Sequence, residues 1–261
     1  MKKDQFTDPV TEKSLRDAMG ALAERFTPYA YPSIDSTNAE AKRLAVSGKE
    51  YALIAAETQT AGRGRMGRSF YSPDCAGVYF SILYRLGEPL ADAVSITSAA
   101  AVAVMRAVLR VCAKQVEIKW VNDLYLDGKK VAGILAESVT LDKKSSVIIG
   151  IGINLRQSAF PREIADIAGA IGADDVDRSA LIAAILEELL PFLQDPSDRS
   201  WLADYRAFSC VIGKNVAWFD QSRTDTGVAV DIDENGALLV KTESGATMRL
   251  STGEISVRVK E

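Results

Sequence analysis

The chain has 261 residues, of which 48% are hydrophobic and 25% are charged, and its formal net charge is −4. These values are ordinary for a globular protein, and the acidic balance argues against nucleic acid as the main partner. Histidine is absent, which excludes Ser-His-Asp triads, Cys-His dyads and histidine metal sites. The cysteines, Cys75, Cys112 and Cys210, form no C-x-x-C pair. Neither a disulfide framework nor a cysteine-rich zinc site is therefore expected, and a reducing cytoplasm fits best.

The first thirty-odd residues predict one helix followed by a break. Met1–Val10 is polar and lacks the apolar core of a signal peptide. Thr11–Phe26 has apolar side chains near helical spacing, which predicts a short amphipathic helix. Pro28 and Pro32 then break the chain.

The central part of the chain predicts a sheet with two helices. The first helix opens with Asp35-Ser36-Thr37-Asn38, where Thr37 with Glu40 fits a capping box, and Ala39–Val46 continues it until Gly48. The second, Ala91–Ala113, is apolar but is interrupted by Asp92 and Arg106, so we interpret it as a buried helix and not a membrane span. The predicted strands are Tyr51–Glu57, Gly77–Arg85, Val116–Trp120, Leu124–Leu126, Lys130–Ser138 and Ser146–Leu155.

The last third changes character after two further helices, Arg178–Leu193 and Arg199–Phe208. Short strands at regular spacing then predict a small barrel, namely Asn215–Phe219, Thr226–Ile232, Ala237–Lys241, Thr247–Leu250 and Ile255–Val259. Strands in succession with helices elsewhere indicate an α+β fold with a mixed or antiparallel sheet. We expect a helical extension at 1–30, a catalytic domain at 31–210 and the barrel at 211–261.

The segment from Gln59 to Arg68 contains three glycines and three arginines within seven residues. Glycine lets the backbone approach a ligand, and arginine offers a fork of donors to phosphate or carboxylate. The composition favours a mobile loop that closes over a polyanionic ligand. A solvated basic loop and a nucleic-acid-binding segment are the alternatives. A Lys-Ser/Thr ending is missing, so this is not a P-loop.

Polar and basic residues also gather between Lys119 and Lys130. Asn122-Asp123 is typical of a turn, although the Asp123 carboxylate offers an oxygen ligand for Mg²⁺. Lys130 begins a strand that soon becomes apolar, so its ammonium can hold a carboxylate or phosphate at the mouth of a pocket. The residues alone leave the structural and the functional interpretations open.

Two further segments suit a flat ligand with polar edges. Gly150 and Gly152 lie within a predicted strand, where glycine marks either a ligand against bare backbone or tight packing of a helix. Ser36 and Asn38 flank Thr37 at a helix N-terminus, which favours polar ligand atoms, although capping alone explains Thr37.

Taken together and in this order, these segments resemble the biotin–protein ligase family, whose members biotinylate carboxylase subunits. The resemblance runs from about Tyr31 to near the C-terminus. Four motifs carry it, namely Ser36-Thr37-Asn38, Gly62–Arg68, Lys119–Asp123 with Lys130–Gly133, and Gly150–Asn154. It implies a class II synthetase-like catalytic domain followed by a small SH3-like β-barrel.

The resemblance also implies a role for each matching residue. Arg65 and Lys130 would be catalytic, and Asp123 would hold Mg²⁺. Biotin would contact polar residues and floor glycines, namely Ser36, Thr37, Asn38, Gln59, Arg63, Gly64, Arg65, Lys130, Gly133, Gly150 and Gly152. ATP and the adenylate would contact Arg63, Arg65, Arg68, Asn122, Lys130 and Asn154.

The implied reaction has two steps. The biotin carboxylate attacks the α-phosphorus of ATP, which gives biotinyl-5′-AMP and pyrophosphate. A lysine amine of a biotin carboxyl carrier protein then attacks the mixed anhydride and releases AMP. Neither step needs a histidine, because Arg65, Lys130 and Mg²⁺ can stabilise the developing negative charge. A homodimer is compatible with the family, and neither DNA nor a membrane is expected as a partner.

A few positions depart from the family pattern. Val121 replaces a usual proline, Met66 replaces a frequent arginine, and Phe70 stands where tryptophan is common. Some members also carry an N-terminal winged-helix domain that binds DNA. Only about thirty residues precede Tyr31, too few for such a domain, so we expect a monofunctional ligase.

Two other interpretations compete with this one. A lipoate–protein ligase shares the fold and the adenylate chemistry, although the Gly/Arg loop and Lys119-Trp120 favour biotin. A non-catalytic biotin-binding regulator would keep the fold without the activity. The presence of Arg65 and Lys130 and the acidic net charge argue against that second alternative.

Overall fold

A seven-stranded mixed sheet forms the centre of the computed structural model, which describes residues 8–86, 93–141, 144–156, 159–220, 223–251 and 256–259. Its strand order is β1-β2-β3-β7-β6-β5-β4. The strands are β1 (Thr27–Ile34), β2 (Tyr51–Gln59), β3 (Gly77–Arg85), β4 (Glu117–Lys119), β5 (Asp123–Leu126), β6 (Lys129–Leu141) and β7 (Lys144–Asn154). The β1–β2 pair is parallel and the other described pairs are antiparallel, so of the predicted mixed or antiparallel sheet the mixed form is confirmed.

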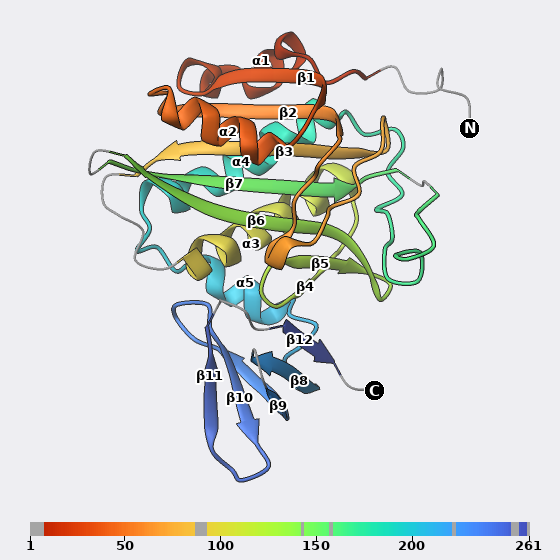
Figure 1. Ribbon diagram of the computed structural model, residues 1–261, viewed down its shortest axis with the longest axis vertical. Helices are drawn as coiled ribbons and strands as arrows, with labels where there is room; N and C mark the ends of the chain where they lie inside the picture. The colour runs from red at the N-terminus through yellow and green to blue at the C-terminus, as the bar shows by residue number, and fades with distance from the viewer. Residues whose placement is uncertain are drawn as a thin grey trace.

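Helices cover both faces of this sheet (Figure 1). The α-helices are α1 (Glu12–Met19), α2 (Thr37–Val46), α3 (Ala93–Cys112), α4 (Arg178–Gln194) and α5 (Trp201–Ala207). Successive side chains of a strand point to opposite faces. Leu53 of β2 therefore packs in the large core with α3 and α4, while Ile54 packs beneath α2 with Ala41 and Ala45. The candidate site lies on the α2 face.

Helix α3 is the buried core helix that the sequence predicts. Val94–Cys112 is long and apolar enough to cross a membrane, but 78% of its most apolar stretch is buried inside the protein. Its charged groups are paired, because Arg106 binds Asp204 of α5 at 2.8 Å and Arg110 binds Glu187 of α4 at 2.9 Å. Positions 91 and 92 of the predicted helix lie outside the described residues, as do 1–7, 255, 260 and 261.

The predicted N-terminal helix is divided in two. Thr11 caps α1 by accepting a hydrogen bond from the Ser14 N–H, while its own N–H donates to Ser14 Oγ. Gly20 has a positive φ of 53° and ends α1, after which the 3₁₀ helix η2 (Gly20–Glu24) follows. The Ser14 hydroxyl lies 2.8 Å from Ser179 Oγ of α4, so α1 is docked onto the catalytic domain.

Strand β1 is absent from the sequence prediction, which placed a break there. Pro28 and Pro32 lie inside this strand, and β1 pairs with β2 alone at the edge of the sheet. An edge strand leaves one row of backbone groups unpaired, so a proline without an N–H is tolerated. The strand crosses the expected boundary between residues 30 and 31, and the sheet therefore begins within the supposed extension.

The expected capping box of α2 is wrong. The N-cap is Ser36, and its side chain makes no capping hydrogen bond. Thr37 instead directs its hydroxyl to Gln59, and the Glu40 carboxylate accepts from Tyr31 Oη and Arg43. The helix start is therefore shaped by contacts with the sheet, which a local pattern does not contain.

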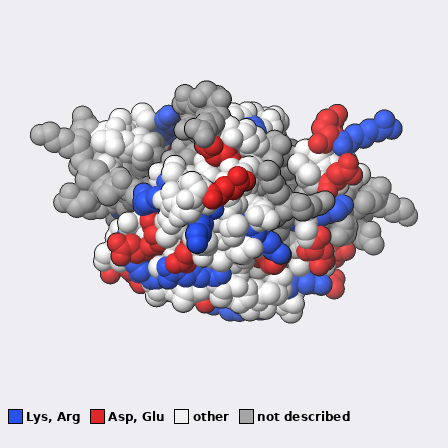
Figure 2. Space-filling model, turned by 90° about the horizontal axis from the view of Figure 1, so that it is seen from below, with Lys and Arg blue, Asp and Glu red and all other residues white. Residues whose placement is uncertain are grey.

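A second sheet of five strands follows α5, in the order β11-β10-β9-β8-β12. The strands are β8 (Asn215–Asp220), β9 (Arg223–Ile232), β10 (Leu238–Thr242), β11 (Thr247–Leu250) and β12 (Ser256–Val259), which confirms the predicted small β-domain. Trp120 donates its indole N–H to the Gly236 carbonyl at 2.9 Å, and Arg206 binds Asp231 at 2.7 Å. Seen from below, acidic and basic side chains are interspersed on this end of the molecule (Figure 2).

Candidate active site

The first part of the site is a polar cluster where α2 meets the end of β2. Gln59 Oε1 accepts from the Thr37 N–H at 2.9 Å and from its hydroxyl at 3.2 Å. The other end of the same amide donates to Ser72 Oγ at 3.0 Å. Ser36, Thr37 and Ser72 are at most 4% exposed. These groups therefore form a fixed set of donors and acceptors within the fold.

The second part links α2 to the sheet through Asn38. The Asn38 amide donates to Glu137 Oε2 at 2.8 Å, and the Ser81 hydroxyl donates to Asn38 Oδ1 at 2.6 Å. Ser81 lies opposite Gly150 in the β3–β7 register, and a Cβ at Gly150 would overlap Asn38 Oδ1. Gly150 is therefore required because the Asn38 side chain rests on its backbone.

The third part is a patch of bare backbone. Gly133 of β6 and Gly152 of β7 lie opposite one another. The Phe70 ring covers this pair, because a Cβ at Gly152 would lie 2.5 Å from Phe70 Cε1 and a Cβ at Gly133 would lie 3.4 Å from Phe70 Cε2. Tyr79 supports the ring edge-on, with 6.3 Å between centroids. The two glycines thus form a flat floor beneath one aromatic ring, which we call the glycine floor.

The cationic end of the glycine floor is formed by Lys130. Its Nζ lies 3.2 Å from the Cβ position at Gly133 and 2.6 Å from Asp123 Oδ1. Asp123 itself lies opposite Gly133 in the β5–β6 register. An ammonium is therefore present where a ligand carboxylate lying on the floor would end, and it is already balanced by one carboxylate.

Arg65 reaches the same region from the Gly/Arg loop. Its Nη1 donates to Asn122 Oδ1 at 3.1 Å, and the Asn122 amide donates to the Ile134 carbonyl at 2.9 Å. Burial lowers the pKa of the Arg65 guanidinium, and the negative charge of Asp123 opposes this shift. A cation in such a partly desolvated position interacts strongly with phosphate oxygens.

The Gly/Arg loop closes on itself through its backbone. The Phe70 N–H donates to Gly62 O at 2.9 Å, and the Gly64 N–H donates to Arg68 O at 2.7 Å. The 3₁₀ helix η3 (Arg65–Gly67) forms its tip, with φ of 58° at Met66 and 72° at Gly67. In Figure 1 the loop descends from β2 across β7 and β6.

The structure brings most of the predicted residues together, but not all to one point. Arg63 is exposed and lies 3.8 Å from Glu137, and Arg68 is exposed at the loop tip. Asn154 donates to the Gly169 carbonyl at 2.9 Å, beyond the end of the floor. Sequence reasoning missed Glu137, Ser72 and Ser81. Glu137 follows Gly133 by four residues in one strand, so strand alternation already places it on the floor's face.

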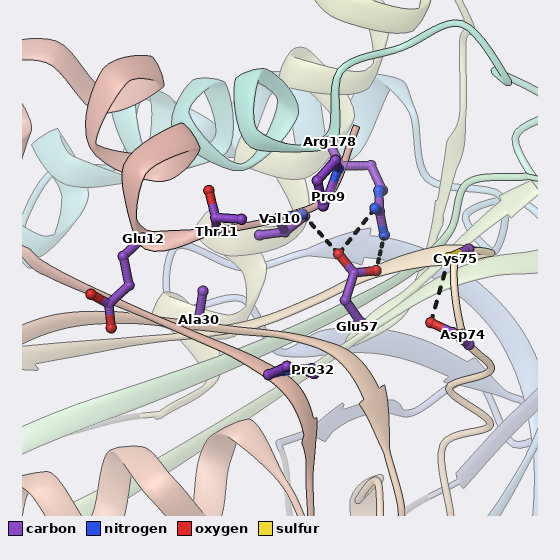
Figure 3. Close-up of a pocket in the computed structure, with 10 residues that line it drawn as sticks. All are labelled: Pro9, Val10, Thr11, Glu12, Ala30, Pro32, Glu57, Asp74, Cys75 and Arg178. Carbon is purple, nitrogen blue, oxygen red and sulfur yellow. Dashed lines mark hydrogen bonds and ion pairs between the residues drawn. The ribbon is translucent and has the colours of Figure 1, made fainter. Parts of the chain in front are cut away.

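A separate cavity of about 370 Å³ lies beneath residues 9–12 (Figure 3). Glu57, Asp74 and Cys75 on its wall have ligand atoms within 4.8 Å of one another and form the one metal-compatible group of three found in the described residues. Both Glu57 oxygens already bind Arg178, which disfavours a metal there. At the glycine floor, Asp123 offers one carboxylate, which suits Mg²⁺ that takes its other ligands from substrate phosphates and water.

Comparisons with known proteins identify the family. Residues 30–154 match the model of the Biotin/lipoate A/B protein ligase family, and residues 211–258 match that of the Biotin protein ligase C terminal domain. The chain is 32% identical to the biotin–[acetyl-CoA-carboxylase] ligase of Mycobacterium tuberculosis, with 97% of each chain covered. It belongs to the biotin protein ligase family. A bifunctional ligase/repressor of Bacillus subtilis is 35% identical over 81% of this chain and 68% of the relative.

The solved structures agree with this family. The biotin protein ligase of Aquifex aeolicus in complex with biotin and ATP superposes with a TM-score of 0.75 at 30% identity, covering 89% of this chain and 99% of the other. The chain is thus an AMP-forming biotin ligase that uses ATP and biotin, as the resemblance predicted. The match to a biotin-ligase C-terminal domain and the names of these relatives favour biotin over the lipoate alternative.

Proposed function

We propose that the glycine floor binds the fused rings of biotin between the polar cluster at Thr37 and the ammonium of Lys130. The bare backbone of Gly133 and Gly152 under a single aromatic ring carries this proposal. A flat ligand would fit on the floor once Phe70 swings away, because its ring and the end of the Lys130 side chain are the groups nearest the two glycines. The amide of Gln59 and the hydroxyl of Thr37 supply the polar contacts at the ring end.

In the first step, Lys130 exchanges its partner Asp123 for the biotin carboxylate and holds it as a point charge. A carboxylate oxygen attacks the α-phosphorus of ATP, and pyrophosphate leaves with the electron pair of the broken P–O bond. Arg65 binds Asn122, and Lys130 binds the next residue, Asp123, so the two cations lie in one region of the site. From there Arg65 can stabilise negative charge on the α-phosphate. Asp123 would hold Mg²⁺, which neutralises phosphate charge when it is bound.

In the second step, the neutral amine of an acceptor lysine attacks the carbonyl of biotinyl-5′-AMP. The C–O bond to AMP breaks, an amide forms, and the amine loses one proton. The Gly/Arg loop slows the competing hydrolysis of the anhydride, because Phe70 and Arg65 cover it from one side and keep water away. The acceptor is a biotin carboxyl carrier protein or domain of a biotin-dependent carboxylase, in line with the acetyl-CoA-carboxylase named for the mycobacterial relative.

Biotin-dependent exchange of labelled pyrophosphate into ATP tests this proposal, with lipoate as the alternative substrate. We expect exchange with biotin and a loss of about a hundredfold or more in Arg65→Ala. Arg85→Ala is the matched control, because Arg85 is a partly buried arginine that pairs with Glu50 near the other end of β3. Exchange with lipoate alone, or equal activity in both variants, would contradict the proposed roles.

The remaining partner predictions concern DNA and self-association. Residues 8–26 dock onto α4, and the acidic net charge of −4 supports a ligase that does not read DNA. A gel-shift assay with biotin-operon DNA tests this, and sedimentation tests the predicted homodimer. All three cysteines are free thiols, which fits the predicted cytoplasmic location.

A further inference from the structure

Two buried arginines hold the segment before α1 against the catalytic domain. Arg156 and Arg178 are both 2% exposed. Arg156 Nη2 binds Asp8 Oδ1 at 2.7 Å, and Arg178 Nε binds Asp8 Oδ2 at 3.1 Å. Arg178 also donates to the Asp8 backbone carbonyl at 2.7 Å. Asp8 lies 148 positions before Arg156 in the sequence, and its single carboxylate thus pairs with two buried guanidinium groups of the core.

Glu57 of β2 completes this network. Its carboxylate binds Arg178 through both oxygens, at 2.6 and 3.1 Å, and accepts from the Val10 N–H at 2.7 Å. Figure 3 shows the Glu57 carboxylate between Val10 and the Arg178 guanidinium. Two carboxylates therefore balance two guanidinium groups, and removal of Asp8 would leave a net positive charge in a buried region.

The same arginines also hold the end of the chain segment that returns from the Gly/Arg loop. Arg156 Nη1 donates to the Cys75 carbonyl at 3.1 Å, and its backbone N–H donates to the Ala76 carbonyl at 2.9 Å. Arg178 Nη1 approaches the Gly77 carbonyl at 3.5 Å. Cys75 has a φ of 59°, a backbone conformation that needs support from its surroundings in a residue other than glycine.

Only a few residues separate this anchored end from the glycine floor. Ser72 is 4% exposed and bonds to Gln59, and Phe70 lies two residues earlier on the floor itself. On the other side, Glu57 precedes Gln59 by two residues in β2. The network of Asp8 with the two arginines therefore contacts both chain segments that carry side chains to the proposed biotin pocket.

We propose that Asp8 is a positioning residue for biotin activation. It acts through Arg156 on the segment that follows the Gly/Arg loop, and through Arg178 on Glu57. This inference rests on the proposed function of the glycine floor. When Asp8 binds Arg156, the guanidinium is oriented to hold the Cys75 carbonyl, and Phe70 and Ser72 are held over the pocket. Without Asp8 the returning segment is less restrained, so the pocket binds biotin and retains biotinyl-5′-AMP less well.

The experiment compares Asp8→Asn with the unchanged full-length chain in biotin-dependent pyrophosphate exchange. A displacement of about 1 Å in positioning groups can cost up to a hundredfold, so we expect the KM for biotin to rise about tenfold or more. Labelled biotinyl-5′-AMP should also escape faster after dilution. Asp8→Glu, which keeps the carboxylate, should recover part of both properties. All assays are run below the unfolding temperature of each variant.

Asp204→Asn is the matched control, because Asp204 makes a partly buried ion pair with Arg106 between α3 and α5 that includes neither Arg156 nor Arg178. It should lower the unfolding temperature without changing the KM for biotin. If Asp8→Asn only lowers the unfolding temperature, as the control does, Asp8 is merely structural and the inference is wrong.

A second variant keeps the inference testable if Asp8→Asn does not fold. Arg156→Lys retains a positive charge for Asp8 but loses the fork that reaches the Cys75 carbonyl as well. We expect the same rise in KM and the same faster escape of the adenylate, and unchanged values would overturn the inference. Failure of the unchanged chain to exchange pyrophosphate with biotin would instead contradict the proposed function.

Discussion

Gly152→Ala should weaken biotin binding while leaving the free protein nearly as stable. The added Cβ would lie 2.5 Å from Phe70 Cε1, about 1 Å closer than an ordinary contact, so the ring must move. The ring is a movable side chain, and alanine gains about 0.5–1 kcal/mol over glycine in a strand. With biotin in place the methyl group overpacks the pocket, which costs about 1–3 kcal/mol, or roughly a 5- to 150-fold rise in KM for biotin.

Gly150→Ala gives the matched contrast in the same strand and on the same face. There the methyl group would displace the buried Asn38 amide, which bonds to Ser81 and Glu137. Two buried polar groups left unpaired cost about 1–3 kcal/mol each, so we expect a large loss of unfolding free energy in urea. Pyrophosphate exchange measures the KM for biotin of both variants. An unchanged KM in a stable Gly152→Ala protein would refute the assignment of the floor to biotin.

Three other predictions follow from single contacts. Lys130→Met should lower pyrophosphate exchange about a hundredfold or more, because the cation at the end of the floor is lost. Trp120→Phe should lower the urea unfolding free energy by about 1–3 kcal/mol, because the buried Gly236 carbonyl loses its donor. Burial raises the pKa of Asp8, but hydrogen bonding to Arg156 and the charge of Arg178 leave it below its ordinary value of 3.8. The stability that the Asp8 carboxylate contributes is therefore present above that value and lost as the pH falls through the lowered pKa. In Asp8→Asn the unfolding free energy should consequently depend less on pH below about pH 4.

The sequence predicts well those features that depend on local pattern. Gly77–Arg85, for example, forms β3 with the predicted bounds. The site residues were found because their order along the chain matches a family, and β-pairing then brings Gly133 opposite Gly152. The two glycines can be recognised from the sequence, but the register that places them opposite one another cannot.

The features that were missed depend on distant partners or on edges. Pro28 and Pro32 indicate a break locally, yet β1 forms because β2 offers a parallel edge that needs no N–H from them. Thr37 resembles a capping residue, yet its hydroxyl donates a hydrogen bond to Gln59 Oε1, which is 22 residues away in the sequence. Asp8 stands in a polar N-terminal segment, and its pairing with Arg178 follows only from the fold.

The groups that we propose as catalytic in this histidine-free site already have partners in the folded protein. Lys130 is paired with Asp123, and Arg65 donates to Asn122. Under the proposed function, binding of biotin and ATP would exchange one anionic or polar partner for another and would avoid stripping water from a bare cation, which is the costly step for a buried charge. On the same proposal, Asp123 holds the Lys130 ammonium at the end of the floor until the biotin carboxylate takes its place, and the Asp123 carboxylate would then hold Mg²⁺ at the phosphates. Asp123→Asn should consequently weaken both the placement of Lys130 and the use of Mg²⁺, which a rise in KM for biotin and for Mg²⁺ together would reveal.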